Sequence, residues 1–120
     1  MLIEFLQTDF DFKDERGSLI QLVHKDWNQV NYITSLAGTI RGNHYHKVNQ
    51  EAFFVIDGSF KLKLTHIKTN ENDEYIIEAG TFFKIMPDVS HSFEFLTNTQ
   101  LISLYDKGVE QGEIMDIYTN

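Results

Sequence analysis

The stretch Gly38 to Gly58, GTIRGNHYHKVNQEAFFVIDG, decides which fold the chain is expected to adopt. His44 and His46 stand one residue apart, so in an extended strand their imidazoles point to the same face, about 7 Å apart along the backbone. Glu51 follows a short polar turn and begins a returning strand, which would carry its carboxylate back beside the two imidazoles. Two imidazoles and a carboxylate on one face are the side chains of a metal site or of an acid/base site.

Short strands separated by turn-forming residues are predicted along the whole chain. Phe60, Leu62 and Leu64 alternate with polar residues at a period of two, as in a strand with one buried face. Asp57-Gly58, just before them, is the strongest hairpin signal in the sequence. Further strands are predicted over residues 2–6, 18–24, 30–35, 41–46, 51–56, 75–77, 81–85, 91–96 and 100–105.

Two segments lack this strand pattern. The polar run from Asp9 to Gly17 is predicted to be a loop that ends in a turn. The acidic tail after Gly108 is the only segment for which a helix is considered. Because the chain has many short strands, a single proline and no linker, residues 1–120 are expected to form one all-β domain, a sandwich or small barrel.

Composition limits the function classes. With 42% hydrophobic residues, ten phenylalanines and five tyrosines, the 120 residues suit a folded β-rich core. The absence of cysteine excludes disulfides and thiolate zinc sites, so any metal must be held by histidine and carboxylate. A formal charge of −8 argues against nucleic-acid or anionic-membrane partners. No long apolar run is present and the first ten residues are acidic, so the cytoplasm is expected.

The opening stretch resembles the first motif of the cupin superfamily, G-x5-H-x-H-x4-E-x6-G. The second cupin motif, G-x5-P-x-G-x2-H-x3-N, is similar to the stretch from Gly80 to Phe95, with Pro87 shifted by one residue and His91 retained. The resemblance implies a cupin jelly roll, a barrel also described as a double-stranded β-helix. Because Phe93 and Phe95 share the parity of His91, this histidine is expected to face the barrel interior.

In a cupin, the two motifs converge on one site. His44, His46, Glu51 and His91 would then form a set of three histidines and one carboxylate, which suits Fe(II), Mn(II), Ni(II) or Zn(II) with open positions for substrate. The same residues could instead form a hydrogen-bonded polar group that acts on a ligand without metal, because spacing alone does not set geometry. Both interpretations stay open at this point.

A second resemblance covers nearly the whole chain. The segments DERGSLIQL (14–22), VNYITSLAGTIRGNHYHK (30–47) and LISLYDKGVEQGEIMDIY (101–118) are similar to small cupins that act on thymidine-diphosphate-linked 4-keto-6-deoxyhexoses. The 3,4-ketoisomerases are nearest in pattern, followed by cupin domains of capsule and lipopolysaccharide enzymes and by dehydrorhamnose 3,5-epimerases. The resemblance implies a nucleotide-diphosphate sugar as substrate, no required cofactor, and a homodimer. Strand pairing between subunits through 2–6 or a neighbouring strand would cover an exposed sheet edge.

Carried over residue by residue, the resemblance assigns roles. Arg41 would contact the nucleotide diphosphate, and Tyr32 would lie near the sugar as a catalytic hydroxyl donor. Moving a ketone from C4 to C3 needs a base for the C3 proton and a donor to the enediolate, and imidazole can serve as both. We assign His46 as the base and His44 as the stabilising donor, although the sequence does not distinguish them.

Two residues depart from the ketoisomerase pattern. Glu51 stands where those enzymes have a glutamine-like residue, so it is expected to contact either substrate or metal, and the segment around His91 has no counterpart of this form. Three functions are therefore weighed. They are a sugar-nucleotide isomerase or epimerase of surface polysaccharide biosynthesis, a metal-dependent cupin enzyme, and a cupin that binds a sugar without catalysis.

Overall fold

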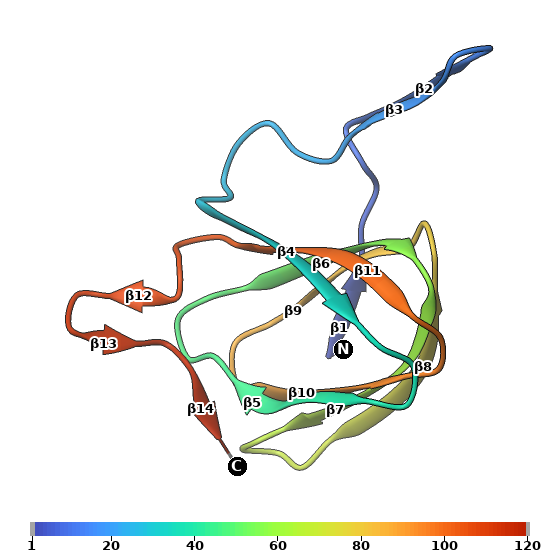
Figure 1. Ribbon diagram of the computed structural model, residues 1–120. Helices are drawn as coiled ribbons and strands as arrows, with labels where there is room; N and C mark the ends of the chain where they lie inside the picture. The colour runs from blue at the N-terminus through green and yellow to red at the C-terminus, as the bar shows by residue number, and fades with distance from the viewer. Residues whose placement is uncertain (1, 120) are drawn as a thin grey trace.

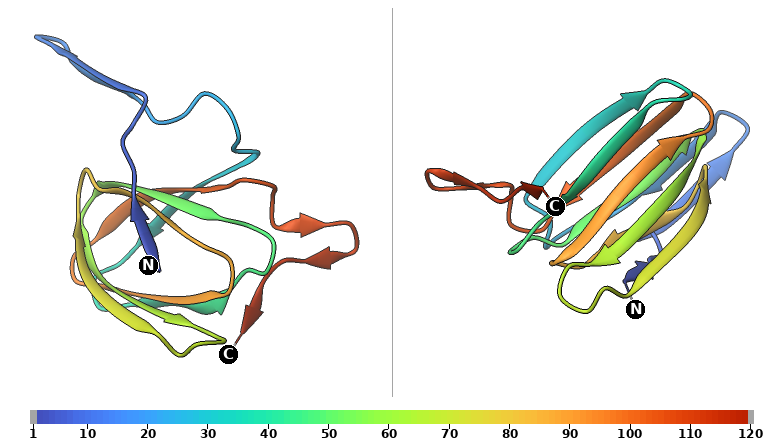
Figure 2. Two further views of the ribbon diagram at one scale, coloured as in Figure 1. Left: turned by 180° about the vertical axis from the view of Figure 1, so that it is seen from behind. Right: turned by 90° about the horizontal axis from the view of Figure 1, so that it is seen from below.

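Two five-stranded antiparallel sheets face each other and enclose the core, as the computed structural model of the chain shows (Figures 1 and 2). The structure describes residues 2–119. The first sheet has the order β1 (Ile3–Phe5), β9 (Phe82–Ile85), β6 (Glu51–Asp57), β11 (Thr99–Tyr105) and β4 (Gln29–Ser35). The second has the order β14 (Tyr118–Thr119), β5 (Ile40–Tyr45), β10 (Val89–Phe95), β7 (Ser59–His66) and β8 (Asn72–Glu78). The predicted jelly roll is confirmed.

Alternating apolar side chains of both sheets fill the space between them. On β7, Phe60, Leu62 and Leu64 are at most 1% exposed, as their period of two predicted. They meet Phe93 and Phe95 of β10 in a cluster of aromatic rings whose centroids lie 4.9 to 6.1 Å apart. Each fully buried side chain of this size contributes about 1.5–3 kcal/mol to folding. The inward direction expected for β10 is therefore correct.

The β-hairpin predicted at Asp57-Gly58 is wrong, because β6 pairs with β9 and β11 whereas β7 pairs with β8 and β10 of the other sheet. Asp57-Gly58 is instead a tight turn that joins β6 to β7. Gly58 has φ +100°, and a Cβ there would lie 2.5 Å from the carbonyl oxygen of Asn98. Only glycine fits such a conformation beside a neighbouring backbone. This turn sends the chain from the first sheet to the second, and it therefore sets the two site-bearing sheets face to face.

The prediction of a loop over residues 9–17 is wrong in part, because this segment contains a strand. β2 (Phe10–Asp14) pairs with β3 (Gly17–Gln21) in a hairpin that projects away from the barrel (Figures 1 and 2). The charged residues hid the alternation of Phe10 and Phe12 with Asp11 and Lys13. The strand predicted over 18–24 ends instead at Gln21. Beyond Gln21, the chain leaves the hairpin and returns toward β4.

The C-terminal tail contains no helix within the described residues. β12 (Glu110–Gln111) pairs with β13 (Ile114–Met115), and Gly112 turns between them with φ +65°. β14 then pairs with β5, so the backbone bonds of the tail go to the barrel instead of to a helix. Across residues 2–119, no helix has the length and apolar character needed to cross a bilayer.

Candidate active site

The strands of the two sheets bring the four residues of the cupin motifs together. His44 lies on β5 directly opposite His91 of β10, and a bulge follows between His91 and Ser92. Glu51 begins β6 in the facing sheet, and His46 follows immediately after β5. One potential ligand atom from each of the four lies within 4.8 Å of the others. Residues 40 positions apart in sequence thus form one cluster.

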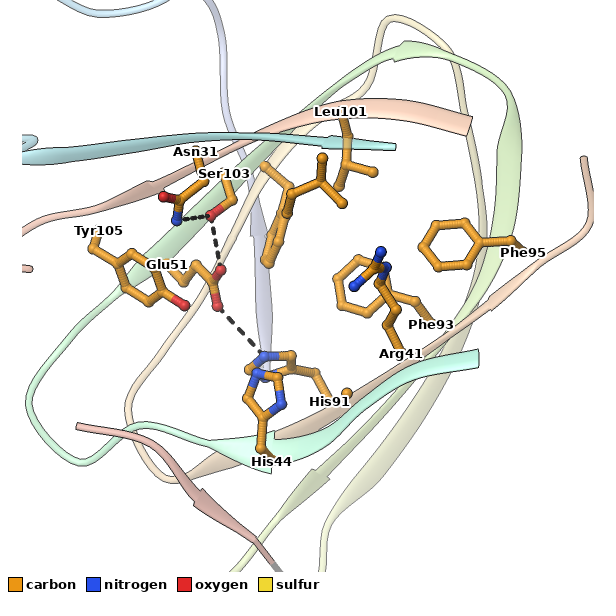
Figure 3. Close-up of a pocket in the computed structure, with 13 residues that line it drawn as sticks. Asn31, Arg41, His44, Glu51, His91, Phe93, Phe95, Leu101, Ser103 and Tyr105 are labelled. Atoms are coloured by element: carbon orange, nitrogen blue, oxygen red, sulfur yellow. Dashed lines mark hydrogen bonds and ion pairs between the residues drawn. The ribbon is translucent and has the colours of Figure 1, made fainter. Parts of the chain in front are cut away.

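Glu51 is the centre of this cluster. Its Oε1 lies 3.0 Å from His46 Nε2 and 3.4 Å from His91 Nε2, and all three side chains are at least 95% buried. The ring of His44 lies 4.6 Å from that of His91, centroid to centroid. Figure 3 shows Glu51 between Ser103, Tyr105 and the imidazoles at one end of the cavity.

Backbone carbonyls orient two of the imidazoles. His46 Nδ1 donates to the carbonyl oxygen of Asp116, and His91 Nδ1 donates to that of Val89 at 3.2 Å. A carbonyl oxygen only accepts, so Nδ1 carries a proton in both rings and Nε2 is directed at Glu51. His91 Nε2 is buried and makes no hydrogen bond within the described chain. A histidine held in this way matches the usual support of a metal ligand.

The electrostatics of the cluster separate the protonation states of its members. Burial alone would raise the pKa of Glu51, but the hydrogen bond from His46 and the nearby imidazole of His91 outweigh it and lower this pKa to about 2. Burial opposes the charged form of His46 as well, yet its bond to Glu51 raises the pKa. Burial and the proximity of His91 lower the pKa of His44 to about 4. At neutral pH the cluster therefore holds a carboxylate and a neutral imidazole at His44.

The cluster forms one end of a cavity of about 330 Å³. The other end has apolar walls from Phe93, Phe95 and Leu101, with the guanidinium of Arg41 beside them (Figure 3). Arg41 Nε donates to Ser35 Oγ at 2.7 Å, and its terminal nitrogen donates to the Thr34 carbonyl at 3.2 Å. Because both acceptors are neutral, the positive charge of Arg41 remains available to an anion.

Tyr32 does not join the site. Its side chain is 63% exposed, and its hydroxyl donates to Gln100 Oε1 at 2.9 Å. Asn31 and Ile33, its neighbours on β4, line the cavity, so alternation along the strand points Tyr32 to the outer face. Tyr32 therefore does not line this cavity and its contact with a sugar stays a prediction, whereas Arg41, His44 and Glu51 do line the cavity.

Sequence analysis missed four residues of the site. Ser103 Oγ donates to Glu51 Oε2 at 3.0 Å, and Asn31 donates to Ser103 at 3.4 Å. Tyr105 lines the cavity, and burial together with Glu51 raises the pKa of its hydroxyl. The alternation of β11 could have placed Ser103 and Tyr105 on the inner face. Asp116 gave no such signal, because only the folded tail brings it to His46.

The family model described as the polysaccharide biosynthesis C-terminal domain matches residues 12–109. The chain belongs to this family. No curated protein matches it.

Solved structures similar to this polysaccharide biosynthesis C-terminal domain include a protein of capsule assembly. The capsular polysaccharide assembling protein CapF from Staphylococcus aureus is 25% identical with a TM-score of 0.70, over 97% of this chain and 34% of CapF. The chain thus spans about a third of the length of CapF.

Two smaller proteins have the same fold. The 3,4-ketoisomerase QdtA from Thermoanaerobacterium thermosaccharolyticum, solved with TDP-4-keto-6-deoxyglucose, is 24% identical with a TM-score of 0.76, over 99% of this chain and 88% of QdtA. The 3′-monoepimerase ChmJ from Streptomyces bikiniensis, solved with dTDP-quinovose, is 16% identical with a TM-score of 0.78, over 98% of this chain and 69% of ChmJ.

Proposed function

We propose that this protein is an isomerase or epimerase that moves a proton next to the ketone of a nucleotide-diphospho-4-keto-6-deoxy sugar in surface polysaccharide biosynthesis. The observation that carries the proposal is the position of His44, a neutral imidazole at the wall of a cavity that also contains Arg41. The family match and the activities named for QdtA and ChmJ support the same class of reaction.

The reaction needs a base and a donor on the carbons beside the ketone. A base removes the C3 proton, and the electron pair of that bond forms the C3–C4 double bond of an enediolate with its charge on the C4 oxygen. If C4 and its oxygen are then protonated while the C3 hydroxyl loses its proton, the ketone moves to C3. If the proton instead returns to C3 from the opposite face, the product is the C3 epimer.

His44 suits the role of the base better than His46. Both nitrogens of His46 are already engaged, one with Asp116 and the other with Glu51. His44 lines the cavity and is neutral at pH 7, so it can accept a proton from the substrate. This assignment moves the role of the base from His46, where the sequence had placed it, to His44.

Tyr105 is our candidate for the donor to the enediolate. It lines the cavity beside Glu51, and burial keeps its hydroxyl protonated. A buried hydroxyl that is already in place can donate to the developing oxyanion without reorganising solvent. Tyr105 thus takes the role that the resemblance had assigned to Tyr32.

The two ends of the cavity suit the two ends of such a substrate. The apolar wall of Phe93, Phe95 and Leu101 offers contact to the methyl group of a 6-deoxy sugar. Arg41 also borders a second cavity of about 470 Å³, whose other walls include hydroxyl and amide side chains. We place the diphosphate at Arg41, because a guanidinium can bind phosphate oxygens in bidentate fashion.

The deciding experiment is an exchange assay in deuterated water with TDP-4-keto-6-deoxyglucose, followed by mass spectrometry and proton NMR. We expect deuterium to enter the sugar at carbons next to the ketone, and His44→Ala to slow this by about 100-fold or more. His24→Ala, a histidine that is exposed and hydrogen-bonded to Asp9, is the matched control and should leave the rate unchanged. Binding without exchange would instead identify a sugar-binding protein.

As a second candidate we propose that His44, His46, Glu51 and His91 hold a divalent cation, Fe(II), Mn(II), Ni(II) or Zn(II). The buried, unbonded Nε2 of His91 favours this, since a metal would satisfy it. A bound cation would polarise the ketone oxygen as a Lewis acid. Metal analysis of protein purified without chelator should find about one metal per chain, and none in the His44→Ala, His91→Ala double variant. Absence of metal after incubation with all four cations would reject the site.

We also propose that the protein acts as a homodimer. The projecting β2–β3 hairpin carries Phe10, Phe12 and Leu19 on one face, each about half exposed. An isolated hairpin of two strands is only marginally stable in water, and an exposed apolar face of this kind is typical of a protein–protein contact. The other strand considered for subunit pairing, β1, already pairs with β9 of its own chain on one side. The cytoplasmic location stays a prediction.

A further inference from the structure

The C-terminal tail pairs with β5, the strand that carries His44 and leads directly to His46. Tyr118 and Thr119 of β14 pair with Tyr45 and His44 of β5, and the rings of Tyr45 and Tyr118 stack with centroids 5.6 Å apart. β5 therefore lies between β10 on one side and the tail on the other (Figure 1). A segment outside the two sequence motifs thus borders the site directly.

Asp116 fastens this tail to the turn that follows β5. It is 1% exposed, and its carboxylate accepts hydrogen bonds from the backbone N–H groups of Lys47, Val48 and Asn49 at 2.9 to 3.1 Å. The side chain of Asn49 donates a further bond at 2.9 Å. A buried carboxylate is costly unless its oxygens are bonded, and here both are bonded by the turn that begins one residue after His46.

The main-chain carbonyl of the same residue bonds the His46 ring. The carboxylate of Asp116 accepts hydrogen bonds from the backbone of residues 47–49, and its carbonyl oxygen accepts a hydrogen bond from His46 Nδ1. One residue thus positions both the turn and the imidazole. The bond to the carbonyl requires a proton on Nδ1 and turns Nε2 toward Glu51, 3.0 Å away. If the carboxylate were lost, the carbonyl would no longer be held in place.

We propose that Asp116 is a positioning residue, through which the C-terminal tail sets the orientation of the His46 ring and the direction of its Nδ1–H group in the active site. Its effect on turnover rests on the proposed function, whereas its effect on the His46 ring does not. Asp116 does not line the cavity, so it acts only through His46 and the turn.

The test follows the His46 ring by NMR at one fixed pH in protein labelled with ¹⁵N-histidine. In the wild-type protein we expect a slowly exchanging Nδ1–H proton, assigned by its loss in His46→Gln. Asp116→Ala should abolish this signal and lower kcat about tenfold or more, with KM little changed. Asp116→Asn, which keeps one acceptor oxygen, should fall between the two. Glu113→Gln, an exposed acid of the same tail, is the matched control and should behave as wild type.

The outcomes separate the proposal from the proposed function. If Asp116→Ala folds and keeps both the Nδ1–H signal and kcat, the proposal is wrong. It is equally wrong if kcat falls while the His46 signal persists, because the effect would then not run through His46. If Asp116→Ala fails to fold, Asp116→Asn decides by the same two readouts. A wild-type protein without turnover would reject the proposed function, and the NMR signal would still test the role of Asp116.

Discussion

Glu51 is the residue on which the electrostatics of the cavity depend. Its side chain is buried, with 4% of the residue exposed. Oε1 lies beside the imidazoles of His46 and His91, and Oε2 accepts a hydrogen bond from the Ser103 hydroxyl, so both carboxylate oxygens have partners. A buried ion pair of this kind does not itself guarantee stability, but removing one partner leaves the other uncompensated. The pair therefore makes the site sensitive to single substitutions at Glu51.

We predict that Glu51→Gln lowers the free energy of unfolding by about 3 kcal/mol, because His46 and His91 lose their carboxylate partner. Urea denaturation at pH 7 measures the change. Glu113→Gln, which removes an exposed acid, should alter stability by less than about 0.5 kcal/mol. Equal stability of Glu51→Gln and the wild type would show that the ion pair contributes nothing net.

The pKa shifts predict how stability depends on pH in the metal-free protein. His44 changes from its ordinary pKa of 6.5 to about 4, so only the unfolded chain takes up this proton between these pH values and stability falls as pH falls. Glu51 adds a loss below 4.5, its ordinary value, toward its folded pKa of about 2. The raised pKa of His46 acts oppositely, and its contribution is lost as pH rises through that pKa.

Urea denaturation from pH 8 to pH 4 checks these signs. The free energy of unfolding should fall between pH 6.5 and 4, and His44→Gln should show a smaller fall in this range because glutamine does not titrate. His24→Gln, an exposed histidine, serves as the control with the wild-type slope. The same slope in His44→Gln as in the wild type would contradict the assignment.

At the scale of elements, the approach of β5 to β10 decides where the imidazoles meet. Gly42 has φ +106°, and a Cβ there would collide with the backbone carbonyl of His91. This close approach coincides with the bulge after His91, and it places His91 opposite His44. A glycine two residues before His44 is therefore part of the geometry of the site, although it has no side chain to contribute.

We predict that Gly42→Ala lowers the free energy of unfolding by more than about 3 kcal/mol, because it combines backbone strain with a backbone collision. Gly38→Ala is the matched control, since Gly38 also has positive φ (+85°) but open space around its Cβ position. It should cost only the strain, about 1–3 kcal/mol. Thermal or urea unfolding of both variants measures the difference, and equal losses would mean that the collision at Gly42 is relieved without cost.

At the scale of the whole molecule, the β2–β3 hairpin stands apart from the barrel with an apolar face (Figure 2). β4 forms an open edge of the first sheet and exposes Val30 and Tyr32 on its outer side. An apolar hairpin and an open, partly apolar edge in one chain are complementary surfaces for two copies related by a two-fold axis.

We predict that the Phe12→Ser, Leu19→Ser double variant converts the proposed dimer to a monomer while the barrel stays folded, because both residues lie on the apolar face of the hairpin. Light scattering after size-exclusion chromatography gives the mass, and circular dichroism reports the fold. Ile76→Ser, which removes a similarly exposed apolar residue from β8, should leave the mass unchanged. A wild-type protein that is already monomeric at micromolar concentration would remove the basis of this prediction.

Local patterns in the amino-acid sequence predicted the all-β fold, and the resemblance to cupins predicted the four-residue cluster. Alternation places side chains on one face of a strand, so the inward direction of Phe60, His91 and Phe93 follows from local pattern alone. The tight turn at Asp57-Gly58 follows from the backbone freedom of glycine in the same local way, but the local pattern did not show that it joins two sheets instead of two paired strands. In β2, the charged residues that flank Phe10 and Phe12 obscured the alternation of apolar and polar side chains, and this strand was missed for that reason.

The residues that surround the cluster, and the protonation states within it, depend on contacts that form only in the folded chain. Asp116 reaches His46 because the tail folds back, and Tyr32 faces outward because the inner positions of β4 belong to Asn31 and Ile33. The neutral state of His44 depends likewise on its burial and on its distance from His91. Contacts between distant segments and the electrostatics of burial arise from how the sheets pack, and no local pattern in the chain encodes them.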